Sequence, residues 1–425
     1  MRIAKSRLIE PGENDPYGVV AVALSLFVFA YSSRFGQVSI LAYYALWLPL
    51  VLVDYRRVLG NYLRYGWIFG FALFACLSVF WSQAPSVTAR ASVQYLSHIV
   101  CALIAMRTLD IWTLVRGGIA GTGLVLAYSL AFGVYHLDPL DGTYSFVGAF
   151  ASKNQLGFYA SLAVFFSFCA IGFLGETRPW KFASLGSGLL AAYSLAASQS
   201  ATSVLTTVLV IGLCLGMRVL ETLSPHHRRM LFLALAVAVL SLVVAAAYGG
   251  GMAMVLGAFG KDATLTGRTY LWQQGIEASA DAPIVGIGYQ AYWVQGFSEA
   301  ERLWEEFYIG TRSGFHFHNT FIASLVETGA VGCLLLAAVL LATLFGHLGR
   351  LLSHARDPES AVLFGVAALL AIRAFVEIDI LNPYHVGSFL LYFAAGKLVP
   401  RTEGNHGRSL DGHRRRPAAV AVSLQ

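Results

Sequence analysis

The amino-acid sequence predicts an all-α polytopic membrane protein with about twelve transmembrane helices. Of its 425 residues, 57% are hydrophobic and only 12% are charged, and the mean hydropathy is +0.65. A soluble chain of this length carries about twice this density of charge. The apolar segments run for about 15 to 25 residues, the length that a helix needs to cross a hydrocarbon core of roughly 30 Å. They lack the alternating pattern of barrel strands, so the spans are expected to be helices.

Each predicted span is an apolar run of suitable length. The runs lie near residues 17–33, 37–53, 65–81, 92–107, 111–134, 154–175, 182–198, 203–220, 229–249, 319–347, 359–377 and 384–398. The run 319–347 is too long for one perpendicular span, so we expect it to tilt or to extend beyond the membrane. The chain is thus divided into nine helices over 1–249, a loop lobe over 250–318, three helices over 319–398 and a basic tail over 399–425.

The basic residues are divided unevenly between the two faces that these spans define. If the N-terminus is cytoplasmic, 21 of the 29 Lys and Arg residues lie on the cytoplasmic side and 8 on the opposite side. Because cytoplasmic loops are enriched in Lys and Arg, both termini are expected in the cytoplasm and 250–318 is expected to form one large periplasmic loop. The net charge of +6 therefore reflects topology and does not indicate nucleic-acid binding.

No motif for a redox, metal or nucleotide cofactor is found in the sequence. The five cysteines all fall inside predicted spans and form no CxxC pair, which argues against a disulfide framework and a cysteine-ligated metal. A Walker loop, a dinucleotide fingerprint and an HExxH motif are also missing. We therefore expect no cofactor, and the free energy for any reaction must come from the substrate.

The 250–318 segment mixes charges, aromatic residues and glycines as a soluble lobe does. Leu271, Trp272 and Ile276 recur at spacings that predict a short amphipathic helix ending near Ala282-Pro283. The glycines of the following Gly286-Ile287-Gly288 stretch predict a tight turn.

Four separated stretches resemble the signature of the O-antigen ligase and Wzy-type polymerase superfamily. GRTYLW followed by PIVGIGY is the first, and HFHNTFIASLVETGAVG, about thirty residues later, is the second. SVFWSQAPSVTARAS and FASKNQLGFYASL are similar to its exopolysaccharide polymerase, or ExoQ-like, branch. The resemblance spans roughly residues 65 to 395 and implies a GT-C-like helical fold.

The resemblance also implies substrates and location. The donor would be an undecaprenyl-diphosphate-linked oligosaccharide, transferred to a hydroxyl of a glycan acceptor at the periplasmic face of the bacterial inner membrane. No metal, nucleotide or nucleic acid would take part. Other polysaccharide export and chain-length proteins are conceivable partners.

The segment GFHFHNTF lies where the polar loop meets the next apolar run, and the resemblance gives it a chemical role. His318 matches the His-Asn motif of the family, so we expect it to deprotonate or orient the acceptor hydroxyl, with Asn319 orienting His318 or the substrate. His316 is expected to contribute less. Either histidine could instead be a hydrogen-bonded structural group. Zinc ligation is a further alternative, but no third or fourth ligand stands at a recognisable spacing, so no metal is expected.

A lipid diphosphate that approaches from the bilayer needs fixed cations near the interface. The candidates for diphosphate or sugar binding are Arg268, Arg312, Lys153, Asn154, Arg90, Arg373 and Glu377. The cations also have structural alternatives, such as a solvated loop charge, a snorkelling side chain or an interface anchor.

Two of these candidates have a more specific alternative. Arg373 and Glu377 stand at i and i+4 and could form an intramembrane ion pair on one helix face. Similarly, the polar loop from Ser198 to Ser203 could bind sugar or could cap the following helix.

The function that these residues favour is metal-independent, inverting glycosyl transfer that polymerises lipid-linked repeat units into exopolysaccharide. A ligase that passes a finished glycan to lipid A core sugars is the first alternative. A non-enzymatic flippase for lipid-linked oligosaccharides is the second, although transporters more often place ionisable groups at mid-membrane.

The charge distribution makes the topology testable. Reporter fusions at Gly260 and at the C-terminus should report a periplasmic and a cytoplasmic location respectively, because of the 21 to 8 division of basic residues. An external C-terminus would contradict the predicted topology and the location of the chemistry.

Overall fold

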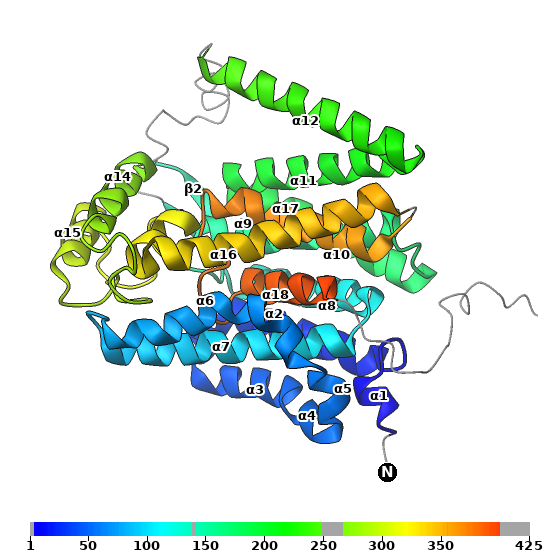
Figure 1. The fold of residues 1–425 in the computed structure, drawn as a ribbon, viewed down its shortest axis with the longest axis horizontal. Coiled ribbons are helices and arrows are strands. Elements are labelled where there is room, and N and C mark those ends of the chain that lie inside the picture. Colours follow the sequence, from blue (N-terminus) through cyan, green and yellow to red (C-terminus); the bar gives the residue numbers. More distant parts are fainter. Residues whose placement is uncertain (1–3, 138–141, 249–266, 355, 400–425) are drawn as a thin grey trace, which may run out of the picture.

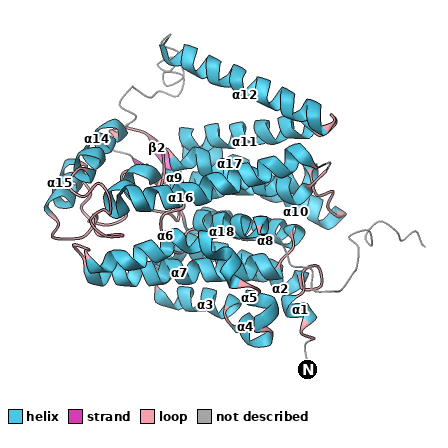
Figure 2. Ribbon diagram, viewed as in Figure 1, coloured by secondary structure: helices cyan, strands magenta, loops and turns pink. Residues whose placement is uncertain are grey.

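The fold is built almost entirely of helices (Figures 1 and 2). The computed structural model describes residues 4–137, 142–248, 267–354 and 356–399. The first half of the chain forms α1 (Ser6–Ile9), α2 (Asp15–Phe35), α3 (Gln37–Trp47), α4 (Pro49–Val53), α5 (Tyr55–Leu59), α6 (Gly66–Leu77), α7 (Pro85–Thr108), α8 (Ile111–Phe132), α9 (Lys153–Gly172), α10 (Arg178–Ser198) and α11 (Ala201–Leu220). The second half forms α12 (Pro225–Tyr248), α14 (Arg268–Ser279), α15 (Ser298–Glu306), α16 (Thr320–Ser353), α17 (Pro358–Ala374) and α18 (Val386–Leu398). Strands β1 (Val134–Leu137) and β2 (Tyr144–Gly148) make a two-stranded antiparallel ribbon.

The prediction of an all-α polytopic membrane protein is confirmed. Helix occupies every one of the twelve predicted spans. Among the described residues, seven helical stretches are long and apolar enough to cross a membrane, and α3 with α4 and α18 form shorter apolar helices.

Helix α18 lies at the centre of the bundle. Every residue from Val386 to Lys397 is buried, and α2, α6, α7, α16 and α17 pack against it. An apolar helix that is covered on all sides belongs to a core. The segment between α17 and α18 is thereby carried into the bundle, and it supplies much of the candidate site.

Helix α16 is broken at Gly329, where the backbone takes φ 62°. We expected the 319–347 run to tilt or to extend beyond the membrane, and the structure shows that it is also kinked. The turn after α14 fills the break: the Ala330 amide donates to Pro283 O (2.8 Å) and the Gly288 amide donates to Glu327 O (2.9 Å). A Cβ on Gly286 would overlap the backbone of Glu327. The predicted tight turn at Gly286 to Gly288 is confirmed, since both glycines have positive φ.

The SVFWSQAPSVTARAS stretch supports the same turn. The Gln83 amide donates to Ile287 O, and the Thr88 hydroxyl donates to Tyr289 O. Ser78 Oγ accepts from the Tyr289 amide at 3.1 Å. This family-like stretch therefore contributes a scaffold rather than reactive groups.

The predicted amphipathic helix is present as α14, but two details of the prediction were wrong. It ends at Ser279, before the expected Ala282-Pro283, and Ile276 is 56% exposed. The buried face consists of Leu271, Gly275 and Ser279. Gly275 lies so close to Phe317 and Ile322 that a Cβ would collide with the Ile322 side chain. The helix packs through Gly275, and a glycine contributes nothing to a hydrophobic pattern. The buried face therefore differs from the one that Leu271, Trp272 and Ile276 predicted.

Substitution of Gly286 by Ala should destabilise the fold. The added Cβ would overlap backbone atoms and would also strain a left-handed residue, at a combined cost of about 2–5 kcal/mol. Gly310→Ala is the matched control, since nothing lies within 4 Å of its Cβ position. Thermal unfolding of the detergent-solubilised protein measures the effect, and equal melting temperatures for the two variants would contradict the packing account.

Candidate functional site

The two histidines are positioned by alternation along the segment before α16. Phe317 is fully buried, with its ring centroid 5.0 Å from that of Trp293, and Phe315 lies 5.2 Å from the same indole. His316 and His318 alternate with these aromatic residues along the chain, and the His318 ring lies edge-on to Phe315, with 6.2 Å between the ring centroids. The centroids of the two imidazole rings are 4.2 Å apart. The aromatic residues thus act as an anchor that presents the imidazole pair.

Asn319 caps α16. Its Oδ1 accepts from the amides of Phe321 (3.0 Å) and Ile322 (3.1 Å), and its Nδ2 donates to Phe375 O (3.0 Å). Both ends of the side-chain amide are therefore engaged with backbone. Asn319 therefore forms no hydrogen bond with His318 in this structure, because the N-terminus of α16 takes the same oxygen; its expected role toward the substrate stays a prediction.

Three donors hold the turn that follows α17. Asn319 binds the carbonyl of Phe375, Arg268 donates from Nη1 to Val376 O (2.9 Å), and the Thr320 hydroxyl donates to Glu377 O (2.7 Å). Consecutive carbonyls are thus bound by the starts of α14 and α16. This arrangement fixes the direction of the Glu377 side chain.

The Glu377 carboxylate is the centre of the candidate site. It is only 5% exposed, and its Oε1 accepts from Asn154 Nδ2 (2.9 Å) and Arg268 Nη2 (3.0 Å). Its Oε2 lies 3.5 Å from His318 Nδ1, close enough for an ion pair although the two atoms are not aligned as a hydrogen bond. Burial alone would raise the pKa of Glu377, but the adjacent His318 and Arg268 outweigh it and hold that pKa below its ordinary value. Glu377 is therefore an anion that joins α9, α14 and the histidine segment.

His316 has a structural contact. Its Nδ1 accepts from the backbone amide of His318 at 3.0 Å, which places the proton of a neutral ring on Nε2. Burial, followed by the neighbouring His318, lowers the pKa of His316 well below its ordinary value. His316 is thus a neutral ring that supports the left-handed backbone of His318 (φ 51°).

The alternative in which Arg373 and Glu377 form an ion pair is not found, since each of them pairs with another residue. Helix α17 ends at Ala374, so the two residues do not share a helix face. Arg373 pairs instead with Asp379 (2.6 Å), lies 4.1 Å from the ring centroid of Phe158, and donates to Ser203 Oγ (3.3 Å). Asp379 was missed in the sequence, where its i+6 spacing from Arg373 gives no signal of a pair.

The KN pair at the start of α9 lies beside this centre. Lys153 Nζ donates to Thr143 Oγ1 at 2.7 Å, and Asn154 Oδ1 accepts from Ser200 Oγ at 2.9 Å. Ser200 also caps α11, because its hydroxyl accepts from the Ser203 amide. The capping alternative for the Ser198 to Ser203 loop is confirmed.

Two further predicted binding residues, besides Arg373 and Lys153, are not bonded to this centre. Arg312 is half exposed and pairs with Glu301 at 2.9 Å, with Glu305 at 4.0 Å. Arg90 is exposed on α7, and within the described parts of the chain it forms no hydrogen bond or ion pair. The structure therefore gathers His316, His318, Arg268, Asn154 and Glu377.

Three of these groups could also act as metal ligands. One ligand atom each from His316, His318 and Glu377 lies within 4.8 Å of the others, so Glu377 supplies the third ligand that the sequence did not reveal. The Arg268 guanidinium binds the same carboxylate, and a cation placed there would be repelled by it. This donor set therefore favours an ion-pair network.

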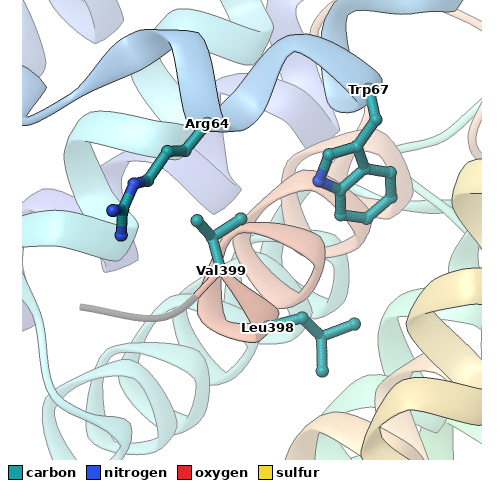
Figure 3. Close-up of a pocket in the computed structure, with 4 residues that line it drawn as sticks. All are labelled: Arg64, Trp67, Leu398 and Val399. Carbon is teal, nitrogen blue, oxygen red and sulfur yellow. The ribbon is translucent and has the colours of Figure 1, made fainter. Parts of the chain in front are cut away.

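A surface pocket of about 380 Å³ lies elsewhere, at the other end of α18. Arg64, Trp67, Leu398 and Val399 line it (Figure 3). Leu398 is 13 residues beyond His385, which is about 20 Å along a helix. This pocket is separate from the histidine centre.

The sequence of this chain is similar to those of known proteins. Residues 186–337 match the O-antigen ligase family, and this range contains Arg268 and both histidines. The chain is also 70% identical over 402 residues to the exopolysaccharide production protein ExoQ of Rhizobium meliloti (strain 1021), covering 94% of this chain and 92% of the relative. The chain belongs to the O-antigen ligase family, in its ExoQ-like branch. Members of this family are membrane proteins, and the family implies a polysaccharide polymerase or ligase with glycosyltransferase-like activity.

The similarity to ExoQ covers 94% of the chain and so extends beyond residues 186–337, which match the O-antigen ligase family. Lys153, Asn154 and Glu377 lie outside residues 186–337, yet Glu377 and Asn154 are bonded to each other at the centre. The site of this ExoQ-like chain is therefore assembled from both sides of the family-matched region.

Proposed function

We propose that this chain polymerises undecaprenyl-diphosphate-linked repeat units into exopolysaccharide at the periplasmic face of the bacterial inner membrane. The observation that carries the proposal is the Glu377 centre, in which a buried carboxylate holds an imidazole and a guanidinium together. A base beside a fixed cation is what glycosyl transfer from a diphosphate requires.

The reaction would be a single inverting displacement. The acceptor oxygen forms a bond to the anomeric carbon of the donor while the bond from that carbon to the diphosphate oxygen breaks, and the diphosphate leaves with the electron pair. The acceptor proton passes to Nε2 of His318, because Nδ1 faces Glu377. Glu377 then stabilises the imidazolium, as a carboxylate does behind any catalytic imidazole.

The cations would neutralise the departing diphosphate. Arg268 is anchored by Val376 O and Glu377, so its guanidinium is held in place beside His318 before substrate arrives. Lys153, at the start of α9 one residue before Asn154, adds a second positive charge. Preorganised charge of this kind is usually the largest single contribution to catalysis.

A ligase that uses lipid A core sugars is the second candidate, and the match of residues 186–337 to the O-antigen ligase family favours it. The name of the 70% identical relative, an exopolysaccharide production protein, favours the polymerase. A deletion strain separates these candidates. Loss of long chains with single repeats retained supports the polymerase, intact polymer left on its carrier supports the ligase, and repeats trapped on the cytoplasmic side support the flippase.

His318→Ala should abolish or nearly abolish transfer, with His316→Ala milder, because a general base is typically worth about 10²–10⁴ in rate. The measurement is transfer from purified lipid-linked repeat in vitro, normalised to membrane abundance. Zinc or chelator should leave the wild-type rate unchanged. A His318→Ala protein that keeps more than about a tenth of the wild-type rate would be too active for a base of ordinary size.

Arg268→Lys should reduce transfer at least about tenfold although the charge is kept. An ammonium cannot bind Val376 O and Glu377 simultaneously in the planar fork that Arg268 uses. Arg302→Lys is a matched control, since Arg302 pairs with Glu306 on the exposed face of α15. Full activity of Arg268→Lys at equal abundance would show that only its charge matters.

A further inference from the structure

A second group of polar side chains adjoins the Glu377 centre and has no part in the chemistry above. The segment that carries Glu377 continues to Asn382, Tyr384 and His385 before α18 begins. Asn382 Oδ1 accepts from Gln290 Nε2 at 2.6 Å, and the Tyr384 hydroxyl lies 2.8 Å from that of Tyr44 on α3. The segment from Phe375 to His385 therefore has one end at the cations and the other among amides, phenols and an imidazole.

This polar group lies deep within the bundle. His385 O is 3.3 Å from Nε2 of His98, which is the fourteenth residue of α7. His98 is also the seventh residue of the predicted span 92–107, so it lies about 10 Å along the helix from the start of that span, inside a hydrocarbon core of about 30 Å. Irregular backbone at such depth is stable only where it is covered by protein or lines a water-filled cavity.

The polar side chains of this group differ in burial. The fully buried ones belong to the core, whereas the half-buried ones can contact a ligand. Tyr43 is fully buried and its hydroxyl bonds to His98 Nδ1 at 3.0 Å, so this pair belongs to the core. Tyr44, Asn382 and His385 are only half buried. The His385 ring makes no hydrogen bond with any described residue. A half-buried imidazole without a hydrogen-bond partner is a candidate ligand group.

The two ends of the segment differ in charge. Arg268 pairs with Glu377 and Arg373 with Asp379, whereas the side chains of Tyr44, Asn382 and Tyr384 form hydrogen bonds with uncharged groups. Neutral hydroxyl, amide and imidazole groups match the hydroxyls of a sugar, and the tyrosine rings match its apolar face. A diphosphate would be attracted to the first end and a saccharide to the second.

The second end also reaches the histidines. His385 is the last of the groups that lower the pKa of His316, after burial, His318 and Arg268. Figure 1 shows α9 and α14 on one side of α18 and α7 and α3 on the other. A saccharide held beside α3 would therefore lie across α18 from α14, the helix that begins at Arg268.

We propose that Tyr44, Asn382 and His385 form the subsite for the acceptor oligosaccharide, the sugar whose hydroxyl attacks the donor. The proposal rests on the proposed function and adds to it a separate place for the second substrate.

The test uses an acceptor that cannot act as donor. The repeat-unit oligosaccharide of the host strain is attached to an octyl group, which carries no diphosphate, and purified lipid-linked repeat is the donor at saturating concentration. Transfer by the full chain in lipid nanodiscs gives separate KM values for the two substrates. Tyr44→Phe and His385→Gln each remove one hydrogen-bonding group from the subsite, and Tyr43→Phe is the matched control from the core.

Tyr44→Phe and His385→Gln should raise the acceptor KM about 3- to 10-fold, the value of one neutral hydrogen bond, with donor KM and kcat unchanged. Tyr43→Phe should leave both KM values unchanged. Equal effects of Tyr43→Phe and Tyr44→Phe, a rise in donor KM alone, or failure of the wild type to use the octyl glycoside would each overturn the subsite. Failure of the proposed function is seen differently: His318→Ala would still transfer the donor glycan, whatever the acceptor variants do.

Discussion

The structure depends on one buried carboxylate. Taking an anion out of water costs several kcal/mol unless charges and hydrogen bonds replace its hydration, and Glu377 obtains these from α9, α14 and the histidine segment. Its own backbone is fixed by Thr320 at the start of α16. The side chains that attach the loop lobe to Glu377 are therefore the candidate reactive groups themselves. The geometry of the site and the position of the lobe depend on each other.

The stretches that resemble the family divide into two physical roles. PIVGIGY and the break at Gly329 are joined by backbone hydrogen bonds, and SVFWSQAPSVTARAS supports them from α7. These residues are restricted by close packing of main chain. The KN pair, GRTYLW and HFHN supply instead the groups that surround Glu377. A motif in this protein can thus be constrained by backbone geometry without contributing any chemistry.

The sequence predicted what depends on local pattern. Apolar run length was enough to locate the helices, and the histidine pair at the mouth of α16 was found from its polar position. Asn319 could have been recognised as a cap, because Asn directly before an apolar helix is a common N-cap. The pairing of Arg373 could not be predicted, since it depends on where α17 ends. Neither could the centre itself, because Asn154 and Glu377 are separated by 223 positions.

That separation has a consequence for biosynthesis. Membrane proteins leave the ribosome from the N-terminus, at about 5–20 residues per second in general. Arg268 precedes Glu377 by 109 positions, so its guanidinium emerges about 5–20 s before its carboxylate partner. During that interval the nascent chain carries an uncompensated charge at the site of the future centre. The last helices to be inserted therefore complete the site, and a chain released before α17 would have every candidate catalytic group except the one that holds them together.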